Sequence, residues 1–228
     1  MKTLYLKLTF ESSCLVGSGE GFGALIDSDI VFDDYGIPYI PAKRIKGCLR
    51  DSAIEVCDML TLSGFKLFDL SRENTESRYK IVSYLFGNPG KEYPAPSYFS
   101  NLYIEDYFDI VSWLKYLMQQ HKEIISKESV INHFTEIRQQ TSIDENTGTA
   151  KEHSLRTIRV AKKGITFTGT IELEEFLPEY VDLLSLSCLN LRRIGTKRNR
   201  GFGKVKCRLY ENSKEINPIP KLEALCKQ

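Results

Sequence analysis

Residues 165–209 read ITFTGTIELEEFLPEYVDLLSLSCLNLRRIGTKRNRGFGKVKCRL and carry the clearest structural signal in the chain. Apolar and polar side chains alternate over 165–173, which predicts a strand with one buried face. Pro178 suits the first turn of a helix, and apolar residues recur at helical spacing from there to about Arg192. A last strand is predicted from alternating Val205, Cys207 and Leu209. The stretch therefore predicts a strand–helix–strand unit.

The N-terminal part of the chain predicts a second unit of the same kind. Residues 4–10 alternate as a half-buried strand, and Pro41 opens a helical stripe that continues to about Leu60. Asn101–Ile104 is a candidate for the following strand. Two such units in succession predict an α+β fold with a ferredoxin-like (RRM-like) core and an antiparallel sheet.

Between the two units the sequence predicts local hairpins and helices. The apolar runs 29–32 and 37–40 flank Asp33-Asp34-Tyr35-Gly36, which is a hairpin signal. Helices are expected over 107–119 and 127–140, followed by a polar projecting segment over 141–156. We expect residues 1–228 to form a single domain, with 105–158 as a helical insertion plus this projection.

Composition and charge exclude several classes of protein. The chain has 31 basic and 30 acidic residues, a net charge of +1, so it is no wholly basic nucleic-acid wrapper, although a local basic stripe can still bind. It has no 18-residue apolar run and no secretory signal, which predicts a cytoplasmic protein without a membrane partner. The six cysteines form no CxxC pair, so we expect reduced, packed thiols rather than zinc ligands.

The strongest candidate for a binding site is the basic segment 192–208, which holds eight Lys and Arg residues and no acidic residue. Its glycines allow backbone N–H groups to approach a phosphate, and the cations add charge-assisted contacts. The alternative is a solvated basic loop without a ligand. The candidate RNA-binding residues of this loop are Lys197, Arg198, Asn199, Arg200, Gly201 and Phe202.

A second candidate is the helix start at Pro41, which is followed by Lys43, Arg44, Lys46 and Arg50. Cations in the first turn oppose the helix dipole, and a bound phosphate would relieve this repulsion. The repulsion costs only tenths of a kcal/mol per residue, so a surface role without a ligand stays open. The glycine-rich stretch Gly17–Gly23 lacks the Gly-Lys-Ser/Thr ending of a mononucleotide loop, so no nucleotide cofactor is expected.

The acidic residues near the predicted hairpin have two interpretations. Asp33 and Asp34 are explained as turn residues. Asp27 follows the glycine-rich stretch directly and has no such explanation. A carboxylate beside RNA is electrostatically unfavourable unless it holds a metal ion or moves a proton, so Asp27 is a candidate catalytic residue.

Taken together, these motifs resemble the RAMP superfamily of CRISPR-associated proteins. The resemblance rests on the glycine-rich loop 17–23, Ile26-Asp27-Ser28, the segment IPYIPAKRIKGCLR at 37–50, Leu85-Phe86-Gly87, and the basic loop at 195–203. Within the superfamily, the chain is most similar to the Cas-seven-type (Csm-three-like) backbone subunits of type III effector complexes.

The resemblance implies a function. Such subunits stack as a filament on a guide RNA, with other copies or related RAMP subunits and with large and small effector subunits. A thumb, corresponding to 141–156, splays out bases. The implied guide contacts beyond the basic loop are Gly17, Gly19, Gly21, Lys43, Arg44, Lys46, Arg50, Thr147 and Arg156. Asp27, with Mg²⁺ or another divalent cation, is implied as the catalytic and metal-binding residue that cleaves complementary target RNA.

Two alternatives remain open. The chain departs from many members of the family, since it has Gly17-Ser18 where a histidine is frequent and Asp29 where a proline is common. A non-catalytic RNA-binding or capping subunit is therefore the main alternative. A guide-processing endoribonuclease is disfavoured, because such enzymes use an early histidine and the first histidine here is His121.

Overall fold

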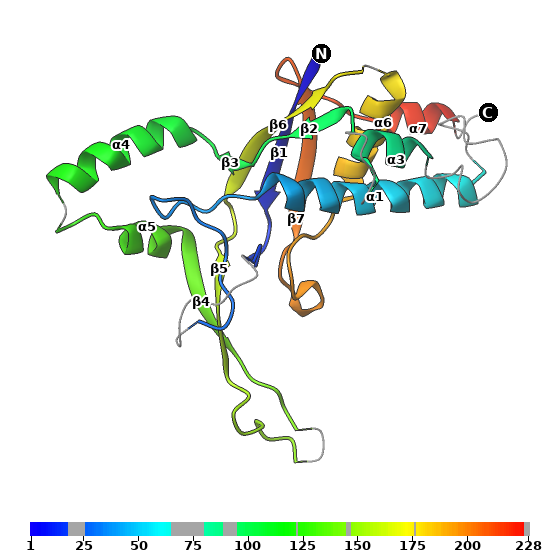
Figure 1. Ribbon diagram of the computed structural model, residues 1–228. Coiled ribbons are helices and arrows are strands. Elements are labelled where there is room, and N and C mark those ends of the chain that lie inside the picture. Colours follow the sequence, from blue (N-terminus) through cyan, green and yellow to red (C-terminus); the bar gives the residue numbers. More distant parts are fainter. Residues whose placement is uncertain are drawn as a thin grey trace.

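A computed structural model describes residues 1–17, 26–64, 80–88, 95–121, 123–144, 147–175 and 177–225 (Figure 1). Its elements are β1 (Lys2–Phe10), α1 (Ala42–Leu62), α3 (Lys80–Phe86), β2 (Ser97–Phe99), β3 (Tyr103–Ile104), α4 (Tyr107–Gln120), α5 (Lys127–Phe134), β4 (Thr135–Gln140), β5 (Arg156–Ala161), β6 (Thr166–Leu173), α6 (Pro178–Asn190), the 3-10 turn η1 (Arg198–Arg200), β7 (Val205–Glu211), β8 (Lys214–Glu215) and α7 (Ile219–Leu225).

The main sheet is antiparallel, with the strand order β2-β6-β1-β7-β8 and with β3 also paired to β6. Helix α1 connects β1 to the β2 side of the sheet, and α6 connects β6 to β7. This order follows the two strand–helix–strand units that the sequence predicts, and it confirms the α+β class with an antiparallel sheet.

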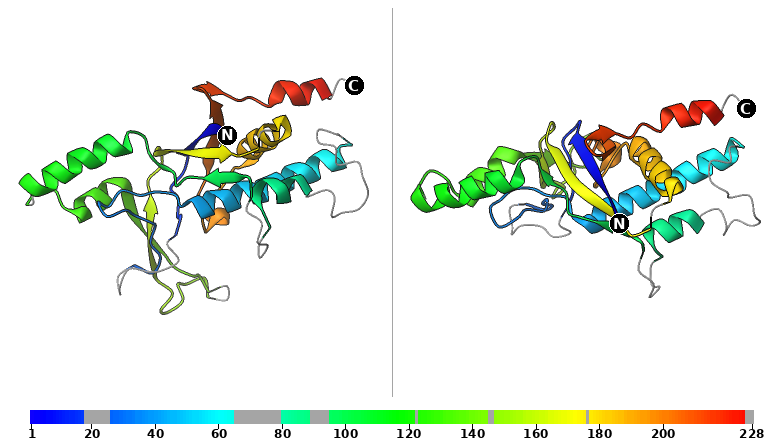
Figure 2. Two further views of the ribbon diagram at one scale, coloured as in Figure 1. Left: turned by 45° about the horizontal axis from the view of Figure 1, so that its top comes forward. Right: turned by 90° about the horizontal axis from the view of Figure 1, so that it is seen from above.

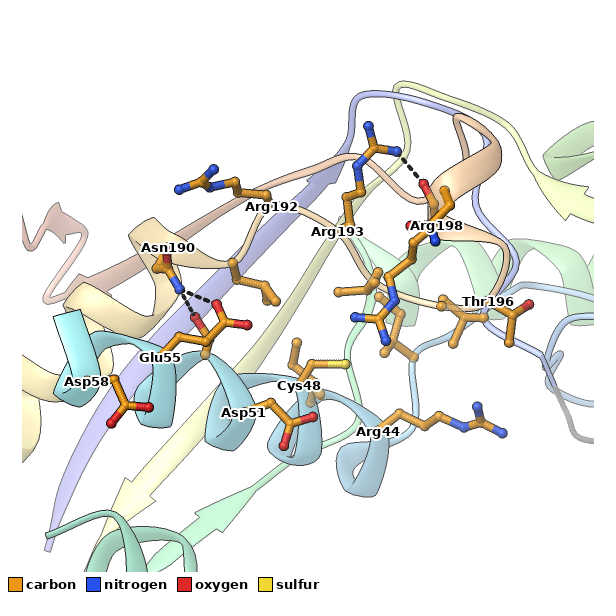
Figure 3. Close-up of a pocket in the computed structure, with 18 of the residues that line it drawn as sticks. Arg44, Cys48, Asp51, Glu55, Asp58, Asn190, Arg192, Arg193, Thr196 and Arg198 are labelled. Carbon is orange, nitrogen blue, oxygen red and sulfur yellow. Dashed lines mark hydrogen bonds between the residues drawn. The ribbon is translucent and has the colours of Figure 1, made fainter. Parts of the chain in front are cut away.

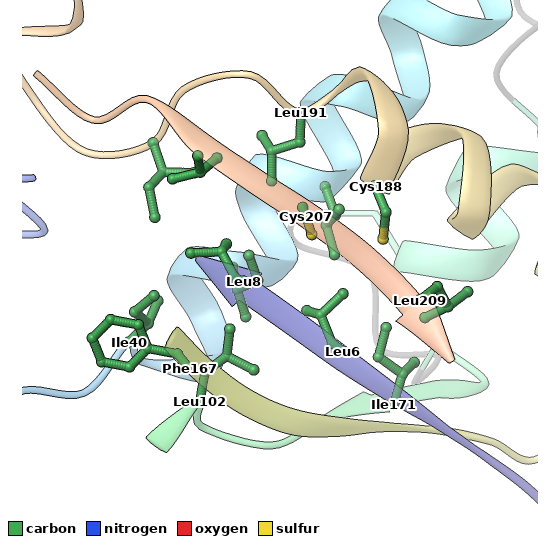
Figure 4. Close-up of a cluster of buried hydrophobic side chains, with 14 of the residues drawn as sticks. Leu6, Leu8, Ile40, Leu102, Phe167, Ile171, Cys188, Leu191, Cys207 and Leu209 are labelled. Carbon is green, nitrogen blue, oxygen red and sulfur yellow. The ribbon is translucent and has the colours of Figure 1, made fainter. Parts of the chain in front are cut away.

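The core lies between the sheet and the helices α1 and α6 (Figure 4). Leu4, Leu6 and Leu8 of β1 are fully buried, as the period-2 pattern predicted. Each buried leucine contributes about 1.5–3 kcal/mol to folding. The buried residues of the two helices are Ile45, Leu49, Ser52, Ala53, Val56, Cys57 and Leu60 on α1, and Tyr180, Leu183, Leu184, Ser185, Leu186, Ser187 and Cys188 on α6.

The start of α1 is fixed by a side chain from a distant segment. Pro41 precedes the helix in an extended conformation and supplies no side-chain cap. The amide of Ala42 instead donates to Asn101 Oδ1 at 2.8 Å. Because this bond satisfies one of the free N–H groups of the first turn, it holds the cationic end of α1 against the strand region before β3.

The sequence prediction of a helix over 127–140 is wrong in its second half. Helix α5 ends at Phe134, and Thr135–Gln140 forms β4, which pairs antiparallel with β5 from Thr135↔Ala161 to Gln140↔Arg156. Val130, Phe134 and Ile137 fit a helical spacing, but pairing with β5 overrides it. We call β4 and β5 the thumb ribbon; it extends the projecting segment away from the sheet (Figures 1 and 2).

The predicted hairpin after Asp29 is present as a turn with a single bridge, Phe32↔Pro38. Asp33 Oδ1 accepts from the amides of Tyr35 and Ile37, at 2.9 and 2.8 Å, and the Tyr107 hydroxyl donates to Asp33 Oδ2. These bonds confirm Asp33 as a turn residue. Most of the glycine-rich stretch lies outside the described residues, since only its first residue, Gly17, is described.

The cysteines in the described part of the chain all carry free thiols. Burial raises the pKa of Cys14 to about 12 and that of Cys57 to about 11, so both remain protonated. The expectation of packed, reduced thiols is thus confirmed for these residues. No helix among the described residues is both long and apolar enough to cross a membrane.

Candidate nucleic-acid interface

The basic loop after α6 is tied tightly to the end of β1. The Ile194 amide donates to Gly203 O, the Gly203 amide to Ser13 O and the Thr196 amide to Leu15 O, all at 2.9–3.0 Å. Gly195 has φ +79°, and a Cβ there would lie 2.4 Å from Leu15 O. No other residue type fits at that position, so the glycine spacing of the loop reflects close backbone packing.

A groove of about 760 Å³ lies between α1 and the basic loop (Figure 3). Arg44, Arg193 and Arg198 line one part of it, and the Arg193 guanidinium donates to the carbonyls of Arg198 and Phe202. These bonds stiffen the loop around the groove. Arginines therefore lie on both walls at this end, and arginine is the side chain that pairs best with phosphate groups in general.

The other end of the same groove is acidic. It is lined by three carboxylates of α1 at helical spacing, Asp51, Glu55 and Asp58 (Figure 3). The Asn190 amide donates to Glu55 Oε2 at 2.9 Å and to Ser52 Oγ at 3.1 Å. Arg192 lies beside Asn190 at this end, so the two ends of the groove differ in their share of acidic side chains.

Two cations of the basic segment 192–208 pair with acidic residues that lie outside this segment. Lys204 pairs with Glu11 at 3.0 Å and Arg208 with Glu215 at 3.1 Å. Glu11 lies just after β1 and Glu215 lies on β8, so neither partner belongs to the basic segment itself. Arg198, in contrast, lines the groove.

Asp27 is bound to the first residues of β5. Its Oδ1 accepts from Arg156 Nη1 at 3.0 Å and its Oδ2 from the Thr157 amide at 2.8 Å. The Asp27 amide donates in return to Thr157 O at 2.8 Å. The Thr157 amide and Arg156 hold the pKa of this exposed carboxyl below its usual value, so it is ionised at neutral pH.

A smaller cavity of about 140 Å³ joins Asp27 to the groove. Asp27, Arg44 and Thr196 are among the residues that line it, and Arg44 and Thr196 also line the groove. An ionised carboxylate therefore shares a cavity with an arginine of the groove.

Two residues further along, Asp29 makes a second and buried pair with β5. Arg159 Nη1 donates to Asp29 Oδ2 at 2.8 Å, and Asp29 Oδ1 accepts from the amide of Ile30. Burial raises the pKa of Asp29, although Ile30 and Arg159 oppose the shift. This pair fastens the segment that carries Asp27 to the thumb ribbon.

Comparison with known proteins decides the family. The family model of the RAMP superfamily matches residues 7–206, which is most of the chain. The chain belongs to the RAMP superfamily. No curated protein sequence matches it.

Two solved structures resemble this RAMP chain in shape. One is a cryo-EM structure of the type III-B Cmr-beta bound to cognate target RNA, with TM-score 0.62, 13% identity, and coverage of 92% of this chain and 97% of the other. The second is type III-B Cmr-beta in the apo state, with TM-score 0.64, 13% identity, and coverage of 93% and 98%. At this identity the likeness shows a shared fold.

The predicted site residues of this RAMP chain separate into groups. Arg44, Arg198 and Asn199 line the groove. Lys46 instead donates to Ser97 O at 3.2 Å and lies over the Phe99 ring, and Arg50 has a buried Nε, so neither lines the groove.

The remaining predicted residues lie further from the groove. Lys43, Arg200, Gly201 and Thr147 are exposed, with Thr147 on the projecting segment, and Gly17 lines the small cavity beside Asp27. Phe202 is half-buried and packs against the core, which leaves less of its ring for a base. Gly19 and Gly21 lie outside the described residues. The RNA contacts of these residues stay predictions.

The divalent cation implied by the family fits only in part. No group of three or more His, Cys, Asp or Glu side chains within the described residues is arranged to hold a metal. Asp27 has lone pairs beyond the two bonds that it accepts, since a carboxylate has about four acceptor positions. Asp27 can therefore give one ligand to an ion whose other ligands come from RNA phosphates and water.

Sequence reasoning missed several residues that the structure brings to this place. Gln140, which the sequence placed in a helix, accepts from Lys197 Nζ at 2.7 Å. Arg159 holds Asp29, and Thr196 lines both cavities. Alternation of polar Thr157 and Arg159 with apolar Ile158 and Val160 was the available signal for β5.

Proposed function

We propose that this RAMP chain is a guide-RNA-binding backbone subunit of a type III CRISPR effector complex and that it cleaves complementary target RNA at Asp27. The observation that carries the proposal is the small cavity in which Asp27 and Arg44 meet, because it places an ionised carboxylate beside a phosphate-binding groove. Family membership and the likeness to type III-B Cmr-beta support the assignment.

The guide RNA binds at the arginine end of the groove. Arg44, Arg193 and Arg198 contact its phosphates there, and the acidic residues of α1 turn the strand away from the other end. Because phosphate contacts release counterions, affinity falls steeply with salt. Phosphate contacts carry no sequence information, so the guide sequence itself selects the target.

The partners follow from this role. They are the guide RNA, the complementary target RNA, further copies of this chain or related RAMP subunits, and the large and small subunits of the complex. The type III-B Cmr-beta structure, which is described as bound to cognate target RNA, supports the target as a partner. A cytoplasmic location remains a prediction from the sequence.

Cleavage requires the residues around Asp27 to orient the target phosphate. A divalent cation held by Asp27 would supply charge stabilisation and an activated oxygen nucleophile. Thr157 and Arg156 fix the direction of the carboxylate, and the Asp29–Arg159 pair fixes the backbone that carries it. This chain therefore contributes position and charge to the reaction.

The main alternative is a scaffold without catalysis. It is favoured by one specific observation: both Asp27 oxygens are bonded to β5, which is a sufficient structural role for the carboxylate.

The deciding experiment measures cleavage of a guide-complementary RNA by the assembled complex, with and without Mg²⁺. Wild type is compared with Asp27→Asn, which keeps the shape and loses the charge. We expect regular cuts that need Mg²⁺ and are lost in the variant, with guide affinity unchanged. Uncut RNA in both complexes, with the guide still bound, would establish the scaffold role.

A further inference from the structure

Lys197 lies on a different side of the basic loop from its neighbours. Thr196, Arg198 and Asn199 line the groove, whereas Lys197 does not. Its ammonium reaches the thumb ribbon and donates to Gln140 Oε1 at 2.7 Å. The loop therefore offers one set of cations to the groove and a separate cation to the thumb ribbon.

The backbone at Lys197 is held in an unfavourable conformation. Lys197 has φ 57°, in the left-handed region, which costs a residue other than glycine about 1 kcal/mol. The amide of Thr196 is bound to Leu15 O on one side, and the Arg200 amide donates to Lys197 O on the other. Hydrogen bonds on both sides thus hold Lys197 in a strained backbone conformation within an exposed loop. Strain of this kind is typical of functional positions.

Gln140 and Arg156 are cross-strand partners at the last rung of the thumb ribbon. Gln140 holds Lys197, and Arg156 holds Asp27. The Lys197 ammonium also interacts electrostatically with Asp27 and Arg156. One rung of the ribbon thus brings a carboxylate and two cations from three segments of the chain into one place.

This arrangement suits a phosphate that is being cleaved. As the attacking hydroxyl loses its proton and forms a new P–O bond, the P–O bond to the leaving oxygen breaks and that oxygen gains a proton. Negative charge increases on the non-bridging oxygens during this exchange, and a fixed cation there stabilises the transition state. Asp27 and the phosphate are both negatively charged, and a cation close to both of them, in addition to Arg156, reduces their repulsion.

We propose that Lys197 contacts the scissile phosphate of the target strand and that Gln140 is its positioning residue. The proposal rests on the proposed function, since it assigns the cation of the same cleavage site. It separates Lys197 from Arg44 and Arg198, which bind the guide in the groove.

The test compares single-turnover cleavage of a complementary RNA by complexes assembled on one guide RNA. Lys197→Met removes the charge and keeps the length, and Gln140→Leu removes the acceptor. Gln140→Glu keeps an acceptor for the ammonium. Lys163→Met is the matched control, because Lys163 is an exposed lysine in the turn after β5. Guide affinity is measured for every variant.

We expect Lys197→Met to slow cleavage about 100-fold, the effect of removing one transition-state contact. Gln140→Leu slows it by about 10-fold, because the ammonium remains but is no longer directed. Gln140→Glu recovers most of the rate, and Lys163→Met cuts like wild type. Guide affinity stays unchanged in all four variants.

Three results would overturn the proposal. Lys197→Met complexes that cut at the wild-type rate would exclude a catalytic contact. A loss of guide affinity in Lys197→Met that accounts for its loss of cleavage would make Lys197 a guide-binding residue only. Cleavage that survives Asp27→Asn contradicts the proposed function instead, and a wild-type complex that cuts nothing overturns both.

Discussion

Two aspartate–arginine pairs join the same short segment to β5, and they differ in almost every physical property. In the Asp27–Arg156 pair the side chains are 36% and 64% exposed; in the Asp29–Arg159 pair they are 8% and 15% exposed. Backbone hydrogen bonds and Arg156 lower the pKa of Asp27, whereas burial raises that of Asp29. The N···O distances are nearly equal, 3.0 Å for Asp27–Arg156 and 2.8 Å for Asp29–Arg159. The two pairs therefore differ in burial and not in their separation.

The contrast suggests a division of roles. An exposed ion pair contributes little to stability, because solvent screens it. A buried pair is costly to break, because removing its cation leaves a charged carboxylate in a dry environment without that ion partner. The buried pair therefore fixes the backbone, and the exposed pair leaves Asp27 available for chemistry.

The largest expected effect is on stability when the buried pair is broken. Arg159→Met should lower the free energy of unfolding by about 3 kcal/mol, because Asp29 is left buried without its cation. Urea denaturation of the purified chain measures the change. Arg156→Met is the matched control and should unfold at the wild-type urea concentration. Equal losses in both variants would show that exposure does not separate the two pairs.

A second, smaller effect concerns protonation. Both carboxyls have a reference pKa of 3.8. The folded pKa of Asp27 is lowered, so its stabilisation is present above the reference value and is lost as pH falls through the folded pKa. The folded pKa of Asp29 is raised, so its contribution is present at low pH and is lost as pH rises through its folded pKa.

Carboxyl ¹³C NMR titration of the two residues checks this order. We expect the Asp27 midpoint below 3.8 and the Asp29 midpoint above it. Asp27→Asn and Asp29→Asn assign the two signals. Midpoints in the reverse order would contradict the assignment of burial as the dominant cause.

The smallest effect is that of salt on the same titration. At about 1 M NaCl the screening length falls to about 3 Å, which weakens exposed pairs and leaves buried ones nearly unchanged. The Asp27 midpoint should move up toward its reference value, while the Asp29 midpoint stays constant. A shift of Asp29 as large as that of Asp27 would mean that solvent reaches both pairs equally.

Much of the fold was predictable because local pattern and tertiary packing agree in it. Leu4, Leu6 and Leu8 alternate in the sequence and are buried in the structure, and Pro178 begins α6 as expected. The thumb ribbon was missed at β4, because Ile137 continues a helical spacing although it lies on a strand. Pairing with β5 is a long-range effect that a local pattern does not contain.

The sequence identified several residues of the candidate site, but it did not identify the contacts between them. Asp27 and the basic loop were identified, but Gln140 was not, since its role depends on a cross-strand register. Asp29, which departs from the pattern that the family resemblance implied, is paired with Arg159. A partner 130 residues away along the chain could not be read from local sequence.

The register of the thumb ribbon determines where the projection can change in length. Gln140 and Arg156 form the last pair of the ribbon before its tip. They are the residues of the ribbon that bind Lys197 and Asp27, so these contacts do not involve the tip. Adding or removing residues at the tip leaves these contacts in place. Inserting a single residue within β4, in contrast, turns the side chains that follow it to the opposite face of the ribbon. The tip is thus the place where evolution can vary the reach of the projection and where a fluorophore or peptide can be attached.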